Sequence, residues 1–299
     1  DVIDRMFSRF RESYQGERLL IPLSGGMDSR LIAGMLKRNG IDNCLCFTYG
    51  DESSEESRLS RHTAEALGFE WRCFRYTEED CAHWSVSEQY RSFMRYACKG
   101  VSKPNDHDYA AVIQMAEEGL CGPNSIFFPG HSADMNAGSH IPPDYPDLYA
   151  GTLSIVDEII RHHANLLWFE PKKMLRTPAA AGILAEIEKD SATPAGHANN
   201  PLAACEMWNA EQRQSKYIIN CVRTYEFVGS RWRTLWDYEF MDFFLRVPDE
   251  LRYGQRLWID CLNRHIFVNE LAALAEIPIT GHGPLKSITS LKAPAKRST

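Results

Sequence analysis

The residues with the clearest chemical potential form a short loop, Ser24–Ser29, which reads Ser-Gly-Gly-Met-Asp-Ser. Its two glycines let backbone N–H groups approach an anion closely, and its serine hydroxyls can donate hydrogen bonds to phosphate oxygens. The carboxylate of Asp28 would repel a phosphate, so its presence makes sense if it holds Mg²⁺ that bridges to the phosphates. The loop therefore predicts a site for a phosphorylated ligand together with a divalent cation.

The segments on either side of the loop indicate how it is positioned. Leu19–Leu23 is a short apolar run without polar alternation, which is typical of a buried parallel strand. Leu31–Leu36 predicts a helix that ends at Gly40. The loop between them lies at the carboxyl end of a strand and at the positive end of a helix dipole, where open α/β sheets bind anions. A generic turn with serine and aspartate as helix caps is the alternative, and the strand-turn-helix context argues against it.

Strands and helices alternate over the first 140 residues. Further strands are expected at 44–49, 71–76 and 126–128, and helices at 2–14, 57–67 and 107–119. After a proline-rich connection, mostly helical segments are expected at 152–166, 178–189, 203–228, 237–246 and 256–275, with an exposed loop at 191–201. The alternation implies βαβ units and a parallel sheet. We therefore expect an α/β fold, with helices on both faces of the sheet in a core at 1–140 and a largely helical C-terminal region at 141–299.

Composition and charge exclude several classes of protein. The chain has 299 residues, 44% of them hydrophobic, and a net charge of −7. These values are typical of a globular protein with a sizeable core, and the acidic balance argues against a nucleic-acid partner. We see neither a transmembrane stretch nor a signal peptide, so we expect a cytoplasmic protein without a membrane partner. Nine scattered cysteines without a CxxC pair predict buried thiols in a reducing compartment rather than a zinc site.

The loop and its surroundings resemble those of a known superfamily. Ser-Gly-Gly-x-Asp-Ser is the signature of the PP-loop ATP pyrophosphatases, and the Walker pattern GxxxxGK[ST] is absent. The segment Leu20–Ser29 is most similar to the synthetase domain of asparagine synthetases. The resemblance implies an adenine nucleotide α-hydrolase-like fold whose loop binds the β- and γ-phosphates of ATP, which leave as pyrophosphate. It also implies that a carboxylate is adenylated and that ammonia then displaces AMP.

The resemblance further implies which residues contact the nucleotide. The phosphates would lie on Ser24, Gly25, Gly26 and Ser29. The second strand ends in Phe-Thr-Tyr-Gly-Asp at 47–51, similar to the family's strand whose backbone contacts adenine. By position, the base would lie near Leu23, Tyr49, Pro129 and Gly130.

A second carboxylate is expected at Asp134. The strand at 126–128 leads into Pro-Gly-His-Ser-Ala-Asp at 129–134, where the family has Ser-Gly-Glu-Gly-Ser-Asp-Glu and uses its Asp as a magnesium ligand. Asp28 and Asp134 would both follow the carboxyl ends of strands, which suits a bridging Mg²⁺. A loop cap is the alternative role for Asp134.

Departures from the family pattern leave the substrate open. His131 and Met135 stand where the family has glutamates, which puts the aspartate-specific chemistry in question. For His131, a proton-transfer role and no catalytic role are both open. The family also has a late lysine that protects the adenylate and aids ammonia attack. Lys286 is the candidate counterpart and is grouped here with Asp28 and Asp134 as catalytic.

The segment at 226–248 matches the family less closely. Arg231–Asp237 resembles an Arg-x-Pro-Phe-Leu-Asp segment, although it lacks the proline and needs a one-residue gap. The aromatic residues after it recur at helical spacing and are expected in the core: Trp236, Phe240, Phe243 and Phe244. Three charged residues are expected on a solvated helix surface, with phosphate contact as the alternative: Arg213, Lys216 and Arg223.

Together these features predict an asparagine-synthetase-like, ATP- and Mg²⁺-dependent amide ligase. Its substrate would be a small-molecule carboxylate, and its ammonia would come from a glutaminase domain or a partner protein, which nothing in this sequence resembles. The oligomeric state stays open. One alternative is a PP-loop enzyme that modifies tRNA, against which the acidic charge and the lack of paired cysteines argue. The other is a catalytically inactive nucleotide-binding scaffold, which the replaced glutamates would suit.

Overall fold

The computed structural model describes residues 1–163 and 200–280, together with Gly182, Ala185 and Lys189. By their contacts, these residues divide into two compact units. The first consists of Asp1–Ser139 and the described residues from Tyr217 onward, and the second of His140–Lys216. The domain limits expected from the sequence, 1–140 and 141–299, stay a prediction.

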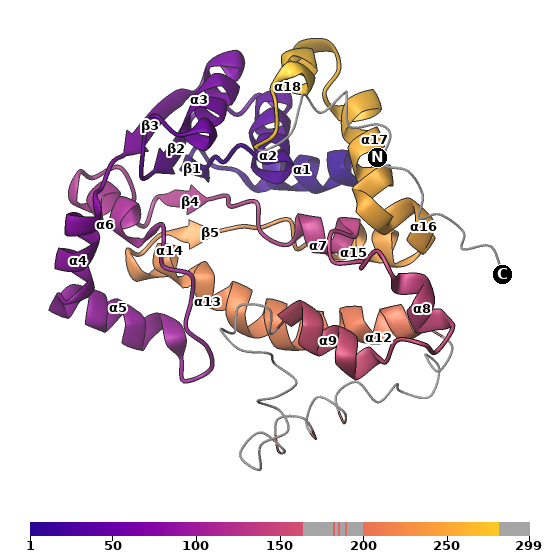
Figure 1. Ribbon diagram of the computed structural model, residues 1–299. Coiled ribbons are helices and arrows are strands. Elements are labelled where there is room, and N and C mark those ends of the chain that lie inside the picture. Colours follow the sequence, from indigo (N-terminus) through magenta and orange to yellow (C-terminus); the bar gives the residue numbers. More distant parts are fainter. Residues whose placement is uncertain (164–181, 183–184, 186–188, 190–199, 281–299) are drawn as a thin grey trace. The chain divides into compact units, whose positions relative to one another are not determined.

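The first unit is built on a five-stranded sheet in which every pairing is parallel (Figure 1). The strands are β1 (Arg18–Pro22), β2 (Cys44–Tyr49), β3 (Glu70–Phe74), β4 (Ser125–Phe127) and β5 (Arg231–Trp232), in the order β3-β2-β1-β4-β5. The chain runs outward from β1 to β3 and then returns to place β4 on the other side of β1. The order thus reverses between β1 and β4, and such a switch point is where doubly wound sheets bind ligands.

Helices flank both faces of this sheet. The helices up to β4 are α1 (Val2–Ser13), α2 (Met27–Arg38), α3 (Glu55–Leu67), α4 (Glu78–Ser85), α5 (Glu88–Cys98) and α6 (Tyr109–Glu117). After β4 come α7 (Ala133–Ala137), α13 (Ile219–Cys221), α14 (Arg223–Phe227), α15 (Tyr238–Leu245), α16 (Asp249–Arg252), α17 (Arg256–Cys261) and α18 (Ala272–Glu276), with short 3-10 turns at Tyr253–Gln255 and Asn269–Leu271 and a π-helical stretch at Leu262–Ile266. The expected α/β fold, with a largely helical region after the sheet, is confirmed.

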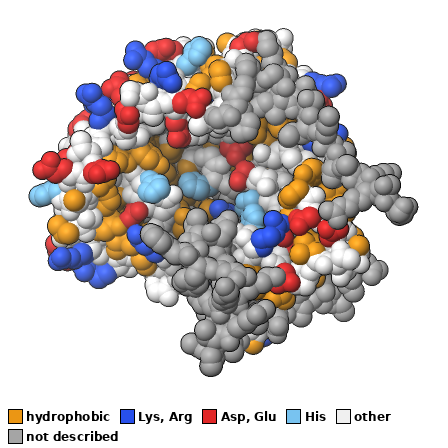
Figure 2. Space-filling model, viewed as in Figure 1, with side chains coloured by type: hydrophobic (Ala, Val, Ile, Leu, Met, Phe, Trp, Pro, Cys, Tyr) orange, Lys and Arg blue, Asp and Glu red, His pale blue; other side chains and the backbone are white. Residues whose placement is uncertain are grey.

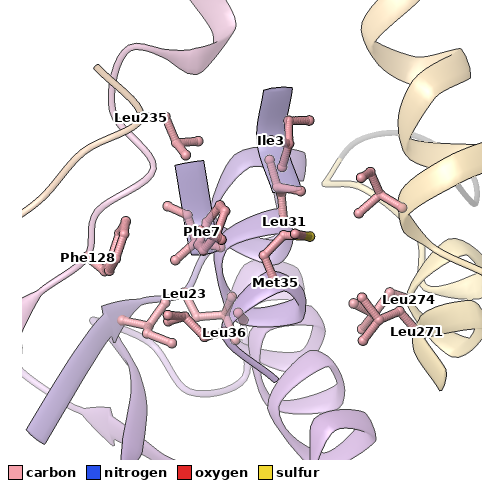
Figure 3. Packing of buried hydrophobic residues seen from close by; sticks show 14 of the residues in the cluster. Ile3, Phe7, Leu23, Leu31, Met35, Leu36, Phe128, Leu235, Leu271 and Leu274 are labelled. Carbon is pink, nitrogen blue, oxygen red and sulfur yellow. The ribbon is translucent and has the colours of Figure 1, made fainter. Parts of the chain in front are cut away.

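Alternate residues of β1 face two separate hydrophobic clusters. Leu19 and Ile21 lie in a large cluster with side chains of α1, α2, α15, α17 and α18, some of which Figure 3 shows. Leu20 lies in a second cluster with Phe47, Phe127 and side chains of α6 and α14. All three β1 side chains are fully buried. This burial on both faces explains why the strand is a continuous apolar run.

The second unit is helical in its described part. It contains α8 (Tyr145–Tyr149), α9 (Ile155–His163), α12 (Pro201–Trp208) and most of a π-helical stretch at Asn209–Ile218. Helix α12 contacts both α8 and α9, and the ring of His163 lies 4.6 Å from that of Trp208. The predicted helix at 178–189 and loop at 191–201 fall almost wholly on residues that are not described.

Several expected elements differ in detail from the structure. The single helix expected at 203–228 is divided into α12, the π-helical stretch, α13 and α14. Trp236 and Phe243 were expected in the core but are 40% and 43% exposed, whereas Phe240 and Phe244 are buried. In the short helix α15, the helical spacing is right but the buried face is narrower than the aromatic pattern implied. No helix in the described part of the chain has the length and apolar character that a membrane span requires.

Candidate active site

The loop Ser24–Ser29 joins β1 to α2, and hydrogen bonds to its own serine hydroxyls stabilise its turn. The backbone N–H of Ser24 donates to Ser29 Oγ at 3.1 Å, and the two serine hydroxyls lie 3.0 Å apart. The N–H of Gly26 donates to Ser24 Oγ at 3.1 Å. Gly26 is the N-cap of α2, and no side chain caps that helix. The positive end of the α2 dipole is therefore directed at the loop, as an anion site requires.

Asp28, in the first turn of α2, lies beside the loop that follows β4. A Cβ atom placed on Gly130 would lie 3.0 Å from the backbone nitrogen of Ser29 and 3.2 Å from Cβ of Asp28. Only a glycine lets the two backbones approach this closely. Two segments about a hundred residues apart in the sequence thus meet at the switch point of the sheet.

The carboxyl group of Asp28 lies in an environment that disfavours its charge. Burial, together with the neighbouring Asp134 carboxylate, raises its pKa to about 8, while hydrogen bonds from the Trp258 indole and the Asp134 backbone act in the opposite direction. Although Asp28 as a residue is half-buried, its Oδ1 atom is fully buried and accepts no hydrogen bond from a described residue. A buried carboxylate oxygen without a partner, next to a second carboxylate, is suited to a cation such as Mg²⁺.

The loop from β4 to Asp134 is itself under conformational constraint. Ser132, at the N-cap of α7, has a φ of 77°, in the left-handed region that residues other than glycine rarely adopt. It lies between His131, which is half-buried, and Asp134, whose Oδ2 accepts a hydrogen bond from the Ser139 hydroxyl at 3.2 Å. Strained residues of this kind are enriched at functional sites, because the surrounding structure must hold them in place.

The residues expected around adenine all lie at the carboxyl edge of the sheet. Leu23 follows β1 and donates its N–H to Phe47 O at 2.8 Å, and Tyr49 ends β2. Their side chains face different clusters: Leu23 is buried on the α2 side, and Tyr49 packs on the other side, stacked on Tyr76. Contact of Leu23 with a base would therefore be through its main chain. Pro129 is buried and precedes Gly130.

Arg30 is a prominent feature that the sequence did not single out. It directly follows the loop, and its side chain is completely buried. Its guanidinium donates to four backbone carbonyl oxygens, those of Gly25, Leu274, Ile277 and Pro278. Burial lowers its pKa to about 10, so it stays charged at neutral pH. The signal that was available is an arginine placed directly before the apolar run Leu31–Leu36, in the same helix.

A family model for asparagine synthase matches residues 15–260, a range that contains the loop, Asp134 and the whole sheet. The chain belongs to the asparagine synthase family. Members of this family are ATP-dependent ligases. The loop and its two neighbouring carboxylates therefore lie in a chain whose family uses ATP. No curated protein matches the sequence.

The remaining residues expected from the asparagine synthase pattern lie in other surroundings. Arg231 pairs with Glu17 at 2.6 Å, and Arg233 lies over the ring of Phe10 at 5.2 Å. Arg223 pairs with Glu226 at 3.1 Å. Arg213 and Lys216 belong to the second unit, where Lys216 donates to Gln212. Lys286 lies outside the described residues.

All nine cysteines are free thiols, as the sequence predicts, although only Cys44, Cys46 and Cys221 are buried. Among the described residues, no group of three or more histidine, cysteine, aspartate or glutamate side chains is placed to hold a metal. An ion between Asp28 and Asp134 would thus have two protein carboxylates and would take further oxygen ligands from phosphate or water, which is the usual mode of Mg²⁺ in nucleotide sites.

Proposed function

We propose that this chain is an amide ligase that activates a small-molecule carboxylate as its adenylate and transfers ammonia or an amine to it. The observation that carries the proposal is the close approach of Asp28 and the Asp134 loop beside Ser24–Ser29, within a match to the asparagine synthase family. The ATP-binding core would be the α/β region at 1–140, with the helical region at 141–299 completing the domain.

In the first step, an oxygen of the substrate carboxylate attacks the α-phosphorus of ATP. The bond from that phosphorus to the bridging oxygen breaks, and pyrophosphate leaves. The N–H groups of the loop and of the first turn of α2 would bind the β- and γ-phosphates, and the hydroxyls of Ser24 and Ser29 would donate to them. Asp28 and Asp134 would hold Mg²⁺, which neutralises charge on the leaving pyrophosphate when bound.

In the second step, the amine nitrogen attacks the carbonyl carbon of the adenylate, AMP leaves, and the nitrogen loses a proton. His131, in the loop that carries Asp134, is the titratable residue proposed for that proton, and Lys286 the one proposed to contact the adenylate. The ammonia would come from a glutaminase domain or a partner protein, and the reaction would take place in the cytoplasm.

A hydroxylamine trap tests this proposal. The protein is incubated with Mg²⁺, ATP, hydroxylamine and a panel of small carboxylates that includes the amino acids. We expect one class of carboxylate to yield its hydroxamate with equimolar pyrophosphate. Asp28→Asn and Asp134→Asn should abolish both products, while Asp42→Asn, which loses only an exposed ion pair to Lys37, should retain them.

Two other outcomes would contradict the proposed reaction. Tight ATP binding without pyrophosphate from any carboxylate would favour a nucleotide-binding scaffold. Salt-dependent binding of tRNA would favour the tRNA-modifying alternative, which the charge distribution does not support. On the face shown in Figure 2, basic and acidic side chains of the described residues are interspersed, and the net charge is −7.

A further inference from the structure

One buried arginine, Arg30, holds the loop Ser24–Ser29, which we call the phosphate loop, through backbone hydrogen bonds. Arg30 Nη1 donates to Leu274 O at 3.0 Å and to Ile277 O at 2.7 Å. Its Nη2 donates to Pro278 O at 2.7 Å and to Gly25 O at 3.3 Å. One planar guanidinium therefore binds the central peptide of the loop and the chain that leaves α18. A lysine, with a compact ammonium, cannot reproduce this fork of donors.

The segment after α18 also lies directly on the loop. The N–H of Thr280 donates to Gly25 O at 3.3 Å, so this carbonyl accepts from two donors. A Cβ placed on Gly25 would lie 2.0 Å from Thr280 Oγ1 and 3.1 Å from a methyl group of Leu59. Gly25 is thus a glycine because the segment at 274–280 covers it. The family match ends at residue 260, before this segment.

The direction of the Gly25 carbonyl decides where the next N–H points. In a trans peptide the C=O of one residue and the N–H of the next point in opposite directions. With Gly25 O held toward Arg30 and Thr280, the N–H of Gly26 is turned the other way, where it meets Ser24 Oγ. Arg30 therefore fixes the orientation of a peptide whose N–H lies on the side of the serine hydroxyls.

Among the described residues, the charge of Arg30 has no counter-charge that pairs with it. All four acceptors of its guanidinium are neutral carbonyl oxygens, and it forms no ion pair with a described residue. A fully buried cation is costly unless an anion compensates it. The β- and γ-phosphates of ATP, lying on Gly25 and Gly26, would supply that anion.

We propose that Arg30 is a positioning residue of the phosphate loop and the buried counter-charge of the pyrophosphate part of ATP. It acts by holding the Gly25 peptide and the segment Leu274–Thr280 together beneath the site. This inference rests on the proposed ATP binding. It predicts selectivity within the nucleotide: loss of Arg30 weakens binding of pyrophosphate and ATP and leaves binding of AMP, which lacks the β- and γ-phosphates, unchanged.

Calorimetric titration with three ligands tests this selectivity. ATP with Mg²⁺, pyrophosphate with Mg²⁺, and AMP are titrated into the wild type, Arg30→Lys and Arg30→Met. We expect Arg30→Met to weaken ATP and pyrophosphate about tenfold or more, since one lost charge-assisted interaction corresponds to at least that factor, with AMP changed less than about twofold. Arg30→Lys keeps the charge but lacks the forked set of guanidinium donors, so its affinity for ATP and pyrophosphate should lie between those of the wild type and Arg30→Met.

Arg38 provides a matched control on the same helix. It also ties α2 to a later segment, since it donates to Ile266 O and to Glu270 at 3.1 Å, but it lies far along α2 from the loop. Arg38→Met should lower the melting temperature and leave the ratio of ATP to AMP affinity unchanged. A purely structural role of Arg30 would give this same result for Arg30→Met.

The possible outcomes separate the inference from the proposed function. An unchanged ratio of ATP to AMP affinity in both Arg30 variants, or equal losses for AMP and pyrophosphate, would overturn the role of Arg30 while leaving the ligase proposal in place. Absence of ATP and pyrophosphate binding by the wild type would overturn both. If Arg30→Met does not fold, Arg30→Lys decides the question by the same ratio.

Discussion

At the scale of residues, Asp28 is the side chain of the site whose charged form is disfavoured by its surroundings. Its Oδ1 is buried and accepts no hydrogen bond from the part of the chain that the structure describes, and the Asp134 carboxylate lies close enough to disfavour its charge. Two carboxylates in such a position are unfavourable in the free protein and become favourable once a cation lies between them. Both residues were predicted from the sequence, because each follows a strand in a recognisable local pattern. Arg30 was not predicted, since all its partners are backbone atoms and, apart from Gly25 O, they lie about 250 residues away.

Removing the charge of Asp28 should separate stability from ligand binding. In Asp28→Asn the buried like-charge interaction disappears, so the free variant should melt at the same temperature as the wild type or above it. Saturating ATP with Mg²⁺, which at a hundred times Kd adds about 2.7 kcal/mol to the stability of the wild type, should add little to that of the variant. Differential scanning fluorimetry with and without ligand measures both quantities. Equal ligand-induced shifts in the two proteins would count against a metal role for Asp28.

Gly130 should be intolerant of a methyl group for a reason specific to the site. In Gly130→Ala the new Cβ would meet the Ser29 backbone nitrogen at 3.0 Å, so the β4–α7 loop must move away from the phosphate loop. We expect KM for ATP to rise about tenfold, as roughly 1.4 kcal/mol of binding is lost. The free energy of unfolding should change by less than about 1 kcal/mol, because a loop shift of a few tenths of an ångström relieves the contact.

Gly182→Ala is the matched control for this substitution, since no atom of the described residues would lie within 4 Å of a Cβ at Gly182. Steady-state kinetics on both variants provides the comparison. An unchanged KM in Gly130→Ala would show that the two loops need not touch for ATP to bind.

At the scale of elements, the pairing of β1 with β4 brings the two carboxylate loops together. The strands β1, β2 and β4 were predicted because burial makes each of them a short apolar run, and β3, in which only Phe74 is buried, was predicted at 71–76. The two residues of β5 were not predicted, since they form a strand only by pairing with Ile126 and Phe127. The helices α4 and α5 were also missed. Tertiary pairing, rather than local propensity, decides such short elements.

Helix α7, which carries Asp134, depends on Gly138 at its C-cap. Gly138 has a φ of 98°, and a Cβ there would lie 2.4 Å from the carbonyl oxygen of Arg252. Gly138→Ala should therefore lose about 2–4 kcal/mol of stability, from left-handed strain together with overlap with backbone. Urea denaturation measures the loss.

Gly40→Ala isolates the strain component of this effect. Gly40 has a φ of 67°, and no described atom lies within 4 Å of its ideal Cβ, so this variant should lose only about 1 kcal/mol. Equal losses in the two variants would contradict the close packing of α7 on Arg252.

Asp108, which precedes α6, should make stability depend on pH. Burial raises its pKa to about 6, while its hydrogen bond with the Tyr225 side chain opposes the shift. Because the folded-state pKa is raised above the unfolded value, the stability contributed by the protonated form is complete below about pH 4 and is lost as pH rises through 6. In Asp108→Asn this loss should be absent, so the variant should exceed the wild type by about 3 kcal/mol at pH 7.5 and match it near pH 4. A difference that does not vary with pH would exclude this cause.

At the scale of the whole molecule, the sequence predicted the family and the location of the site at the carboxyl edge of the sheet, but not every residue that forms the site. The loop, Asp28 and Asp134 depend on short patterns that can be read locally. Other features depend on contacts between distant segments, which no local pattern encodes. They are the hydrogen bonds of Arg30 to the segment after α18, the packing of Thr280 on Gly25, and the close approach of Gly130 to α2. The substrate is decided by side chains around the reacting carboxylate, and the replacements at His131 and Met135 separate this chain from the family pattern there.

The bond of ATP that breaks distinguishes the proposed reaction most directly from other uses of the loop. ATP labelled at its α-phosphate is incubated with the wild type, Mg²⁺, ammonia and the carboxylate panel, and the labelled products are separated. We expect the label in AMP, with an equal amount of pyrophosphate, and neither product from Asp28→Asn. Label in ADP with release of inorganic phosphate, or AMP formation that Asp28→Asn leaves intact, would contradict a pyrophosphate-releasing ligase at this loop.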